Sequence, residues 1–189
     1  MGLASHVMAI ERIQQRLRKV AAALDAAKIP YAVVGGNAVA SWVGRVDQGA
    51  TRATKDVDIL VRRDDTPRIT AVITALGFSR EDLRDIVLFI DPEEPSKKSG
   101  VHLVWANERI RPSYTVLSPT VDEAVRDPEG FLVIDLPALV RMKLTSFRPI
   151  DQVHVADMLS VGLIDATVRA LLPAELLARL EQVEQGLGE

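Results

Sequence analysis

The sequence has no cysteine, few aromatic residues and no long apolar run. None of its 189 residues is Cys, and Phe, Trp and Tyr together make up 4%. Without cysteine, disulfides, thiolate catalysis and zinc–thiolate sites are excluded. No apolar stretch approaches the roughly 20 residues that a membrane-spanning helix needs, and the N-terminus lacks the pattern of a secretory signal. We therefore expect a cytoplasmic protein with no membrane contact.

Strong charge of either sign is also lacking. The formal net charge is −3, which argues against a protein held to nucleic acid by bulk charge alone. Local basic clusters remain, such as Arg45, Arg52 and Lys55, and each is either part of a binding groove or a solvated face. The chain has only three histidines, so any bound metal is expected to be a hard cation rather than a structural zinc.

What the chain does have is a large apolar fraction, 48%, arranged with clear periodicity. Apolar residues recur at helical spacing from Ile10 to Leu24, whereas short apolar runs bounded by turn residues indicate strands. The pattern predicts helices over 6–28, 37–43 and 65–76, strands over 31–34, 57–61, 86–90, 101–105 and 131–134, and helices from 137 onward. We expect an α+β fold, a small mixed β-sheet with flanking helices.

Two finer features follow from the same pattern. The strands over 86–90 and 101–105 are separated by an exposed turn, which indicates an antiparallel hairpin. Thr120 and Glu123 have the spacing of a capping box for a short helix. The change from mixed to purely helical pattern predicts a core over 1–135 and a helical C-terminal subdomain over 136–189 that packs on it.

A pair of glycines and a pair of carboxylates stand at the ends of consecutive strands. Gly35 and Gly36 follow the strand over 31–34, and Asp56 and Asp58 open the strand over 57–61. A dinucleotide-binding motif would need further glycines where Asn37 and the residue at 40 stand, and an acid at the far end of the second strand. Asp56 precedes its strand, so this motif is not indicated.

A metal and phosphate site accounts for both pairs together. Asp56 and Asp58 alternate with Val57 on an extended segment, so their carboxylates project from the same face and repel each other unless a cation lies between them. Phosphoryl-transfer enzymes use this arrangement to hold Mg²⁺ or Mn²⁺. Gly35 and Gly36 would let backbone amides approach the phosphates. Taken singly, each pair also fits an ordinary turn or cap.

At these residues the chain resembles a known superfamily. Gly35-Gly36 and the segment Thr54-Lys55-Asp56-Val57-Asp58-Ile59 are similar to the nucleotidyltransferase fold of the DNA polymerase-β superfamily. The resemblance is greatest to minimal nucleotidyltransferases and to AbiEii-type abortive-infection toxins. A second block, "VRMKLTSFRPIDQVHVADML", resembles the AbiEii helix region through Lys143, Arg148, Asp151 and Asp157.

The resemblance implies a Mg²⁺-dependent (or Mn²⁺-dependent) enzyme that transfers a nucleotidyl group from an NTP to a hydroxyl of RNA, protein or a small molecule. It also permits a toxin–antitoxin role, with an antitoxin partner or a homo-oligomer. The alternative is a catalytically degenerate fold that binds nucleotide or protein, because the superfamily's third carboxylate is missing. His102 stands at the expected position, either as a general base or as an ordinary strand residue, and Asp91 is a possible substitute.

The resemblance also assigns roles to individual residues. Asp56 and Asp58 would bind the metal, with His102 as the third catalytic residue. The nucleotide contacts would come from two glycines, an amide and four cations, namely Gly35, Gly36, Asn37, Arg52, Lys55, Lys143 and Arg148. The four cations could equally be helix-surface or loop-surface charges, and Asn37 could cap the short helix instead of contacting phosphate.

Overall fold

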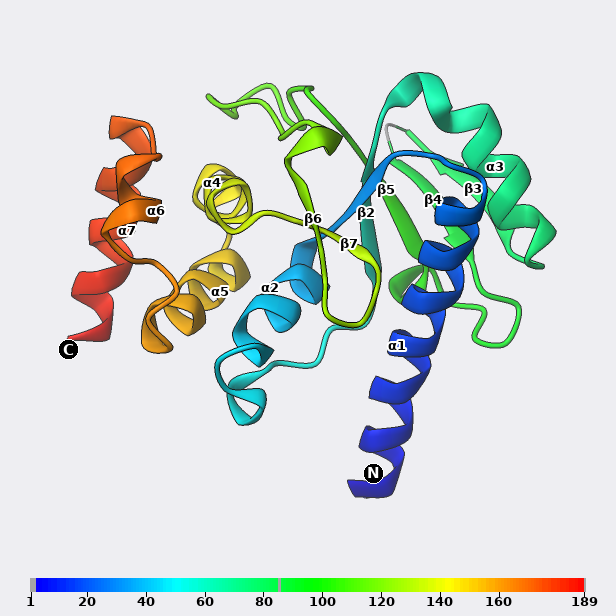
Figure 1. Cartoon of the computed structure of the whole chain (residues 1–189), viewed down its shortest axis with the longest axis horizontal. Coiled ribbons are helices and arrows are strands. Elements are labelled where there is room, and N and C mark those ends of the chain that lie inside the picture. Colours follow the sequence, from blue (N-terminus) through cyan, green and yellow to red (C-terminus); the bar gives the residue numbers. More distant parts are fainter. Residues whose placement is uncertain (1–2, 85, 189) are drawn as a thin grey trace.

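The computed structural model describes residues 3–84 and 86–188, which form a mixed β-sheet flanked by helices (Figure 1). The helices are α1 (Leu3–Ala26), α2 (Gly35–Gly44), α3 (Thr66–Ala75), α4 (Leu136–Ser146), α5 (Pro149–Ser160), α6 (Ala166–Ala170) and α7 (Ala174–Leu187). The strands are β1 (Tyr31–Val34), β2 (Val57–Val61), β3 (Ser79–Leu83), β4 (Ile86–Ile90), β5 (Val101–Trp105), β6 (Ala124–Arg126) and β7 (Leu132–Ile134).

Within residues 3–84 and 86–188 the sheet has seven strands, in the order β3-β4-β5-β2-β1-β7-β6. Strand β2 lies antiparallel to β1 and parallel to β5, while β1 lies parallel to β7. Every residue of β1 is buried, as expected for a central strand that is covered on both faces. The predicted mixed sheet with flanking helices is confirmed, and so is the antiparallel β4–β5 hairpin.

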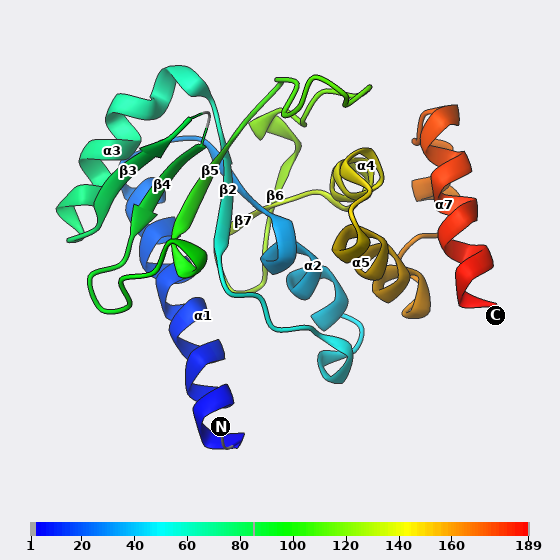
Figure 2. The ribbon, with the colours of Figure 1, turned by 180° about the vertical axis from the view of Figure 1, so that it is seen from behind.

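Helices α1 and α3 pack together against one face of the sheet and lie behind β3, β4 and β5 in Figure 2. The apolar stripe predicted for the first helix is buried at Ile13, Leu17, Val20 and Leu24, whereas the side chain of Ile10 lies outside the described residues. Helix α2 contacts β1 and β2 on one side and α5 on the other. It therefore links the sheet to the C-terminal helices.

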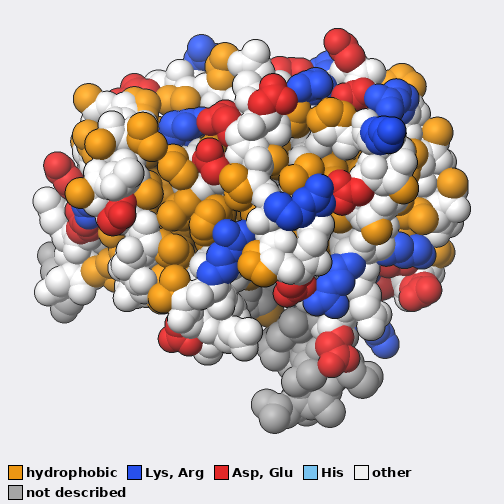
Figure 3. Space-filling view, viewed as in Figure 1, with side chains coloured by type: hydrophobic (Ala, Val, Ile, Leu, Met, Phe, Trp, Pro, Cys, Tyr) orange, Lys and Arg blue, Asp and Glu red, His pale blue; other side chains and the backbone are white. Residues whose placement is uncertain are grey.

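The C-terminal helices α4 to α7 lie beside the sheet, on the side away from α3 (Figure 1). Hydrophobic side chains gather over α4 and α5 in Figure 3. Ile150 and Val153 of α5 are among the exposed large hydrophobic residues. Acidic and basic side chains are interspersed on the rest of this face. Among the described residues, no helix combines the length and the apolar character needed to cross a bilayer.

Two strands were not predicted, and several helix ends differ from the prediction by one to three residues. Strand β3, with the sequence SREDL, and the three-residue strand β6 were not predicted, because neither carries an apolar alternation. Helix α2 begins at Gly35 rather than at residue 37, so both glycines belong to its first turn. The capping box of Thr120 and Glu123 is confirmed at the start of a short 3₁₀ turn.

Candidate active site

The two predicted metal ligands and His102 lie together at one end of the central strands. Asp58 of β2 and His102 of β5 are register partners in a parallel pair, and Asp56 immediately precedes β2. The His102 Nδ1 atom is 3.5 Å from Asp58 Oδ1 and 3.7 Å from Asp56 Oδ2. One donor atom from each residue fits within 4.8 Å of the others, close enough to share a cation. The contact with Asp58 raises the pKa of His102 above its ordinary value.

Gly35 lies directly against the carboxylate of Asp58. It has a φ of +68°, and a Cβ atom built on it would lie 2.1 Å from Asp58 Oδ2. A Cβ on Gly36 would likewise lie 2.9 Å from Thr54 Oγ1. Only glycine at position 35 allows both the left-handed backbone and this close approach. The first turn of α2, with its outward-facing amides, is thereby held beside the two carboxylates.

We expect Gly35→Ala to disturb the carboxylate pair as well as the backbone. The left-handed φ costs an alanine about 1–2 kcal/mol, and the added methyl group must also displace Asp58. Gly162→Ala is a matched control, because its φ of +74° imposes a similar strain with no atom within 4 Å of the new Cβ. Urea denaturation should show a loss of stability in both variants, and the loss should be larger in Gly35→Ala because its methyl group also displaces Asp58. Only Gly35→Ala should lose metal binding in a titration, and equal metal affinity in the two variants would contradict the prediction.

Asn37 and Thr54 hold the loop that carries Asp56. Asn37 Nδ2 donates a 2.7 Å hydrogen bond to the Asp56 carbonyl oxygen, and Thr54 Oγ1 donates a 2.9 Å bond to Asp56 Oδ1. Asn37 does not cap α2, whose N-cap has no side-chain hydrogen bond. Thr54 was not predicted as a functional residue, although its place two residues before Asp56 is part of the quoted motif. The structure therefore supports a positioning role for both residues.

A cavity of about 550 Å³ adjoins these two residues, between α1, α2 and the loops around residues 45–54 and 127–131. Asn37 Oδ1 is buried there without a hydrogen-bond partner among the described residues. Arg52 lines the same cavity, but its guanidinium pairs with Asp157 of α5 at 2.5 Å. The sequence predicted that Asn37, Arg52, Lys143 and Arg148 contact the nucleotide. Of these four residues, Asn37 and Arg52 line the cavity, and Lys143 and Arg148 do not.

Asp127 is a buried carboxylate in the wall of this cavity that the sequence did not identify. It accepts hydrogen bonds from Ser41 Oγ and from the Glu129 backbone amide, and it pairs with Arg45 at 3.0 Å. Its neighbours come from α2 and from its own loop, so only the tertiary fold brings them together. No local spacing could have found it.

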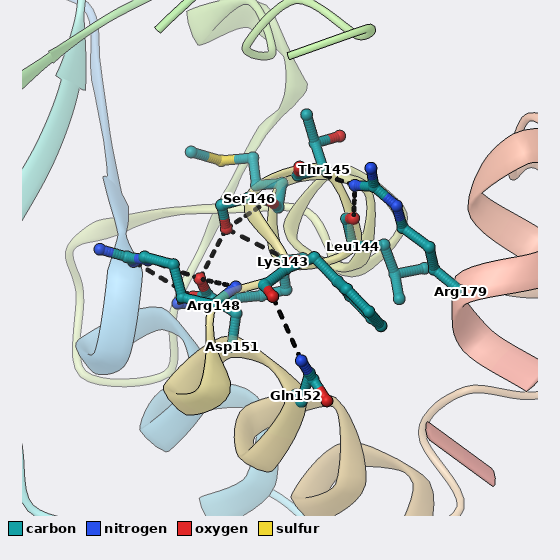
Figure 4. A network of polar contacts seen from close by, with 10 residues as sticks. Lys143, Leu144, Thr145, Ser146, Arg148, Asp151, Gln152 and Arg179 are labelled. Carbon is teal, nitrogen blue, oxygen red and sulfur yellow. Dashed lines mark hydrogen bonds and ion pairs between the residues drawn. The ribbon is translucent and has the colours of Figure 1, made fainter. Parts of the chain in front are cut away.

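Lys143 and Arg148 converge on one buried carboxylate, that of Asp151 (Figure 4). Lys143 Nζ lies 3.0 Å from Asp151 Oδ1, and Arg148 Nε lies 2.7 Å from Asp151 Oδ2. Ser146 Oγ donates a further 2.7 Å bond to Oδ2. Lys143 is 5% exposed, whereas half of the Arg148 side chain is exposed. Arg148 is therefore accessible to a ligand, whereas Lys143 would have to leave the protein interior to contact one.

Arg148 also lies within electrostatic range of Asp58. The pKa of Arg148 is raised, first by its hydrogen bond to Asp151 and more weakly by the charges of Tyr114 and Asp58. Figure 4 shows its side chain extending away from α4 toward the start of α2. Lys55 is exposed and has no ion-pair partner among the described side chains. Asp91 is not part of this group, because it pairs with Arg16 at 2.9 Å.

A family model matches residues 4–136, which include Gly35, both aspartates and His102. The family is described as an uncharacterised nucleotidyltransferase. The chain belongs to this family. No curated protein matches the sequence.

Solved structures of nucleotidyltransferases and related proteins have the same fold as this chain. An antigenic nucleotidyltransferase-like protein from Paracoccidioides brasiliensis has a TM-score of 0.60 and 16% identity, over 94% of this chain and 89% of that one. ANT(2'')-Ia in complex with adenylyl-2''-tobramycin has a TM-score of 0.56 and 18% identity, over 91% of this chain and 98% of that one. At these identities the comparison establishes the fold alone.

A buried histidine should make the stability of this protein depend on pH. Burial, and next the charge of Lys143, lower the pKa of His154 in α5 from 6.5 to about 4, against the smaller opposing effects of Asp151 and Asp157. The unfolded chain therefore binds the proton more tightly than the folded one, so the stabilisation is complete above pH 6.5 and is lost as the pH falls toward 4.

The expected loss from this group is roughly 2–3 kcal/mol. Urea denaturation of the native chain and of His154→Leu at pH 7.5 and 4.5 measures it. The native chain should lose more stability on acidification than the variant, because only the native chain gains this proton on unfolding. The same pH dependence in both would show that His154 does not contribute.

Proposed function

We propose that the protein is a metal-dependent nucleotidyltransferase that moves a nucleotidyl group from an NTP to a hydroxyl of an acceptor. The observation that carries the proposal is the contact between Gly35 and Asp58. Backbone amides at the start of α2, which favour phosphate, lie immediately beside two carboxylates that favour a divalent cation. A triphosphate and its cation need these two environments side by side.

The donor set fits a divalent cation. Asp56, Asp58 and His102 offer three ligand atoms within 4.8 Å of one another, and the lack of a side chain at Gly35 gives the Asp58 carboxylate room beside α2. Such a cation, Mg²⁺ or Mn²⁺, neutralises phosphate charge and polarises the phosphoryl group. The chain's own part is to hold the reactants: the α2 amides orient the phosphates, and Asn37 and Thr54 fix the Asp56 loop.

Arg148 is the cation best placed to contact the nucleotide. Its guanidinium is oriented by Asp151 and stays half exposed, near Asp58. Lys143 is proposed to act through Asp151 rather than on the phosphates, because its ammonium is buried and paired. In the transfer itself, the acceptor oxygen forms a bond to the α-phosphorus, the bond to the leaving pyrophosphate breaks, and the hydroxyl proton passes to a base.

For the acceptor we favour a small molecule over RNA or protein. The cavity beside Asn37 and Thr54 has a volume of about 550 Å³, within the range of roughly 300–1,000 Å³ that small-molecule sites occupy. The ANT(2'')-Ia structure, which carries an adenylylated small molecule, is consistent with this choice. The AbiEii-like toxin role, with an antitoxin partner, a homo-oligomeric state, a cytoplasmic location and a division into domains at residue 135 stay predictions.

A second candidate function is a nucleotide-binding protein without transfer activity. The observation that favours it is the imidazole of His102 at the position expected for a third carboxylate. The experiment that tests both is a melting-temperature measurement with each of the four NTPs, with and without divalent metal, followed by a transfer assay with the labelled NTP that stabilises most. Stabilisation with pyrophosphate release supports the enzyme, and stabilisation without it supports the binding protein. No stabilisation by any NTP contradicts both.

A further inference from the structure

His102 is held in a single tautomer by a bond on the far side of its ring. Its Nε2 atom lies 3.0 Å from the carbonyl oxygen of Lys97. A carbonyl oxygen can only accept a hydrogen bond, so Nε2 carries the proton and donates it. In the neutral ring the other nitrogen, Nδ1, is then an unprotonated lone pair. A backbone carbonyl behind the ring is the usual support for a histidine that binds a metal.

That lone pair is directed at the two carboxylates. Nδ1 lies 3.5 Å from Asp58 Oδ1 and 3.7 Å from Asp56 Oδ2, so three possible metal-ligand atoms face one another across a small space. The strands fix this arrangement, because His102 pairs with Asp58 on one side and with Leu88 of β4 on the other. A base for an acceptor hydroxyl would need Nδ1 to face the acceptor, whereas here it faces the metal ligands.

We propose that His102 is the third ligand of the cation and that the site consequently prefers a first-row transition-metal ion such as Mn²⁺ over Mg²⁺. Mg²⁺ takes oxygen ligands and water, whereas imidazole suits the transition metals and carboxylate is compatible with both. Two carboxylates and one imidazole therefore shift the selectivity of a site that three carboxylates would leave to Mg²⁺. The inference rests on the proposed function for its site, but its test needs no nucleotide.

The first test is metal binding to the full chain, with Mn²⁺ as the probe. Electron paramagnetic resonance of free Mn²⁺ gives its dissociation constant, and competition gives that of Mg²⁺. In the native chain the Mn²⁺ constant should be lower by at least about tenfold, and pulsed measurements of bound Mn²⁺ should show coupling to an imidazole nitrogen. His102→Asp, which restores a third carboxylate, should remove that coupling and reduce the Mn²⁺ preference about tenfold.

His102→Gln is a second variant, which retains a neutral side chain of similar length, and His154→Leu is a control that removes a histidine outside this group. The control should retain the nitrogen coupling and His102→Gln should lose it. Native protein without nitrogen coupling, or with the same Mn²⁺ preference as His102→Asp, would overturn the inference. If Mn²⁺ binds with nitrogen coupling but no NTP stabilises the protein, the inference stands and the proposed function fails. If NTP transfer proceeds but bound Mn²⁺ shows no nitrogen coupling in the native chain, the function stands and the inference fails.

Discussion

Asp58→Asn should abolish the stabilisation of the protein by NTP and divalent metal, and with it nucleotidyl transfer. Asp58 contacts both His102 and the space that Gly35 leaves, so its charge is central to the cation site. An NTP at about a hundred times its dissociation constant should stabilise the native chain by roughly 2.7 kcal/mol. For a protein of this size that is a rise of about 5–10 °C in melting temperature. The variant should show no metal-dependent rise.

The transfer rate should fall by about 10²-fold or more, because a bound metal ion supplies several kcal/mol of transition-state stabilisation. Asp56→Asn should behave in the same way. Asp64→Asn is the matched control, since Asp64 is also a loop carboxylate near the end of β2 but lies on an exposed 3₁₀ turn outside the group of candidate ligands. Its melting curve and transfer rate should equal those of the native chain. A full metal-dependent rise in Asp58→Asn would refute the assignment of the site.

Asp151→Asn should destabilise the fold by about 3–5 kcal/mol, because it leaves a buried ammonium without its counter-charge. Burial alone would raise the pKa of Asp151, but the hydrogen bond from Arg148 and the charge of Lys143 outweigh it and hold the pKa well below its usual range. The ionised carboxylate is thus part of the folded structure at neutral pH. Urea denaturation at pH 7 measures the loss, which corresponds to a fall in melting temperature of roughly 6–20 °C.

Two comparisons separate this effect from a general loss of surface charge. Asp122→Asn removes one partner of the exposed Arg62–Asp122 pair and should cost at most about 1 kcal/mol. The double variant Lys143→Met with Asp151→Asn removes the stranded ammonium, so it should be more stable than Asp151→Asn alone. If the single and double variants are equally stable, the buried Lys143–Asp151 pair is not the cause of the loss.

The sequence was sufficient to predict the central part of the fold and to single out Gly35, Asp56, Asp58 and His102, which the structure brings together. Strands β1 and β2 are apolar and buried, so their pattern is set by local sequence and identifies them directly. The sequence also led to the hypothesis that Gly35 and Asp58 share one site, because Gly35 follows β1 and Asp58 lies at the start of β2. The antiparallel pairing of Val34 with Asp58 then brings the two elements together.

The remaining features depend on contacts between distant parts of the chain. From sequence alone, Lys143 could be a helix-surface cation. Its burial depends on the ion pair with Asp151 in the next helix, and no local sequence pattern predicts that pair. Asn37 reads as a cap or a phosphate contact, whereas its amide in fact bonds to Asp56 across the loop. The orientation of the His102 ring likewise depends on the carbonyl of Lys97, which no side-chain pattern encodes.

Strand β3, one of the two strands that the apolar pattern did not predict, affects how the molecule behaves in solution. Strand β3 is an edge of the sheet, and one of its two sides has no strand partner within the described chain. Its exposed residues include Arg80 and Asp82, so a second copy docking there would have to remove these charges from water. The polar sequence of β3 therefore has two effects. It prevents prediction of the strand from an apolar pattern, and it disfavours aggregation in which neighbouring molecules add strands to this edge.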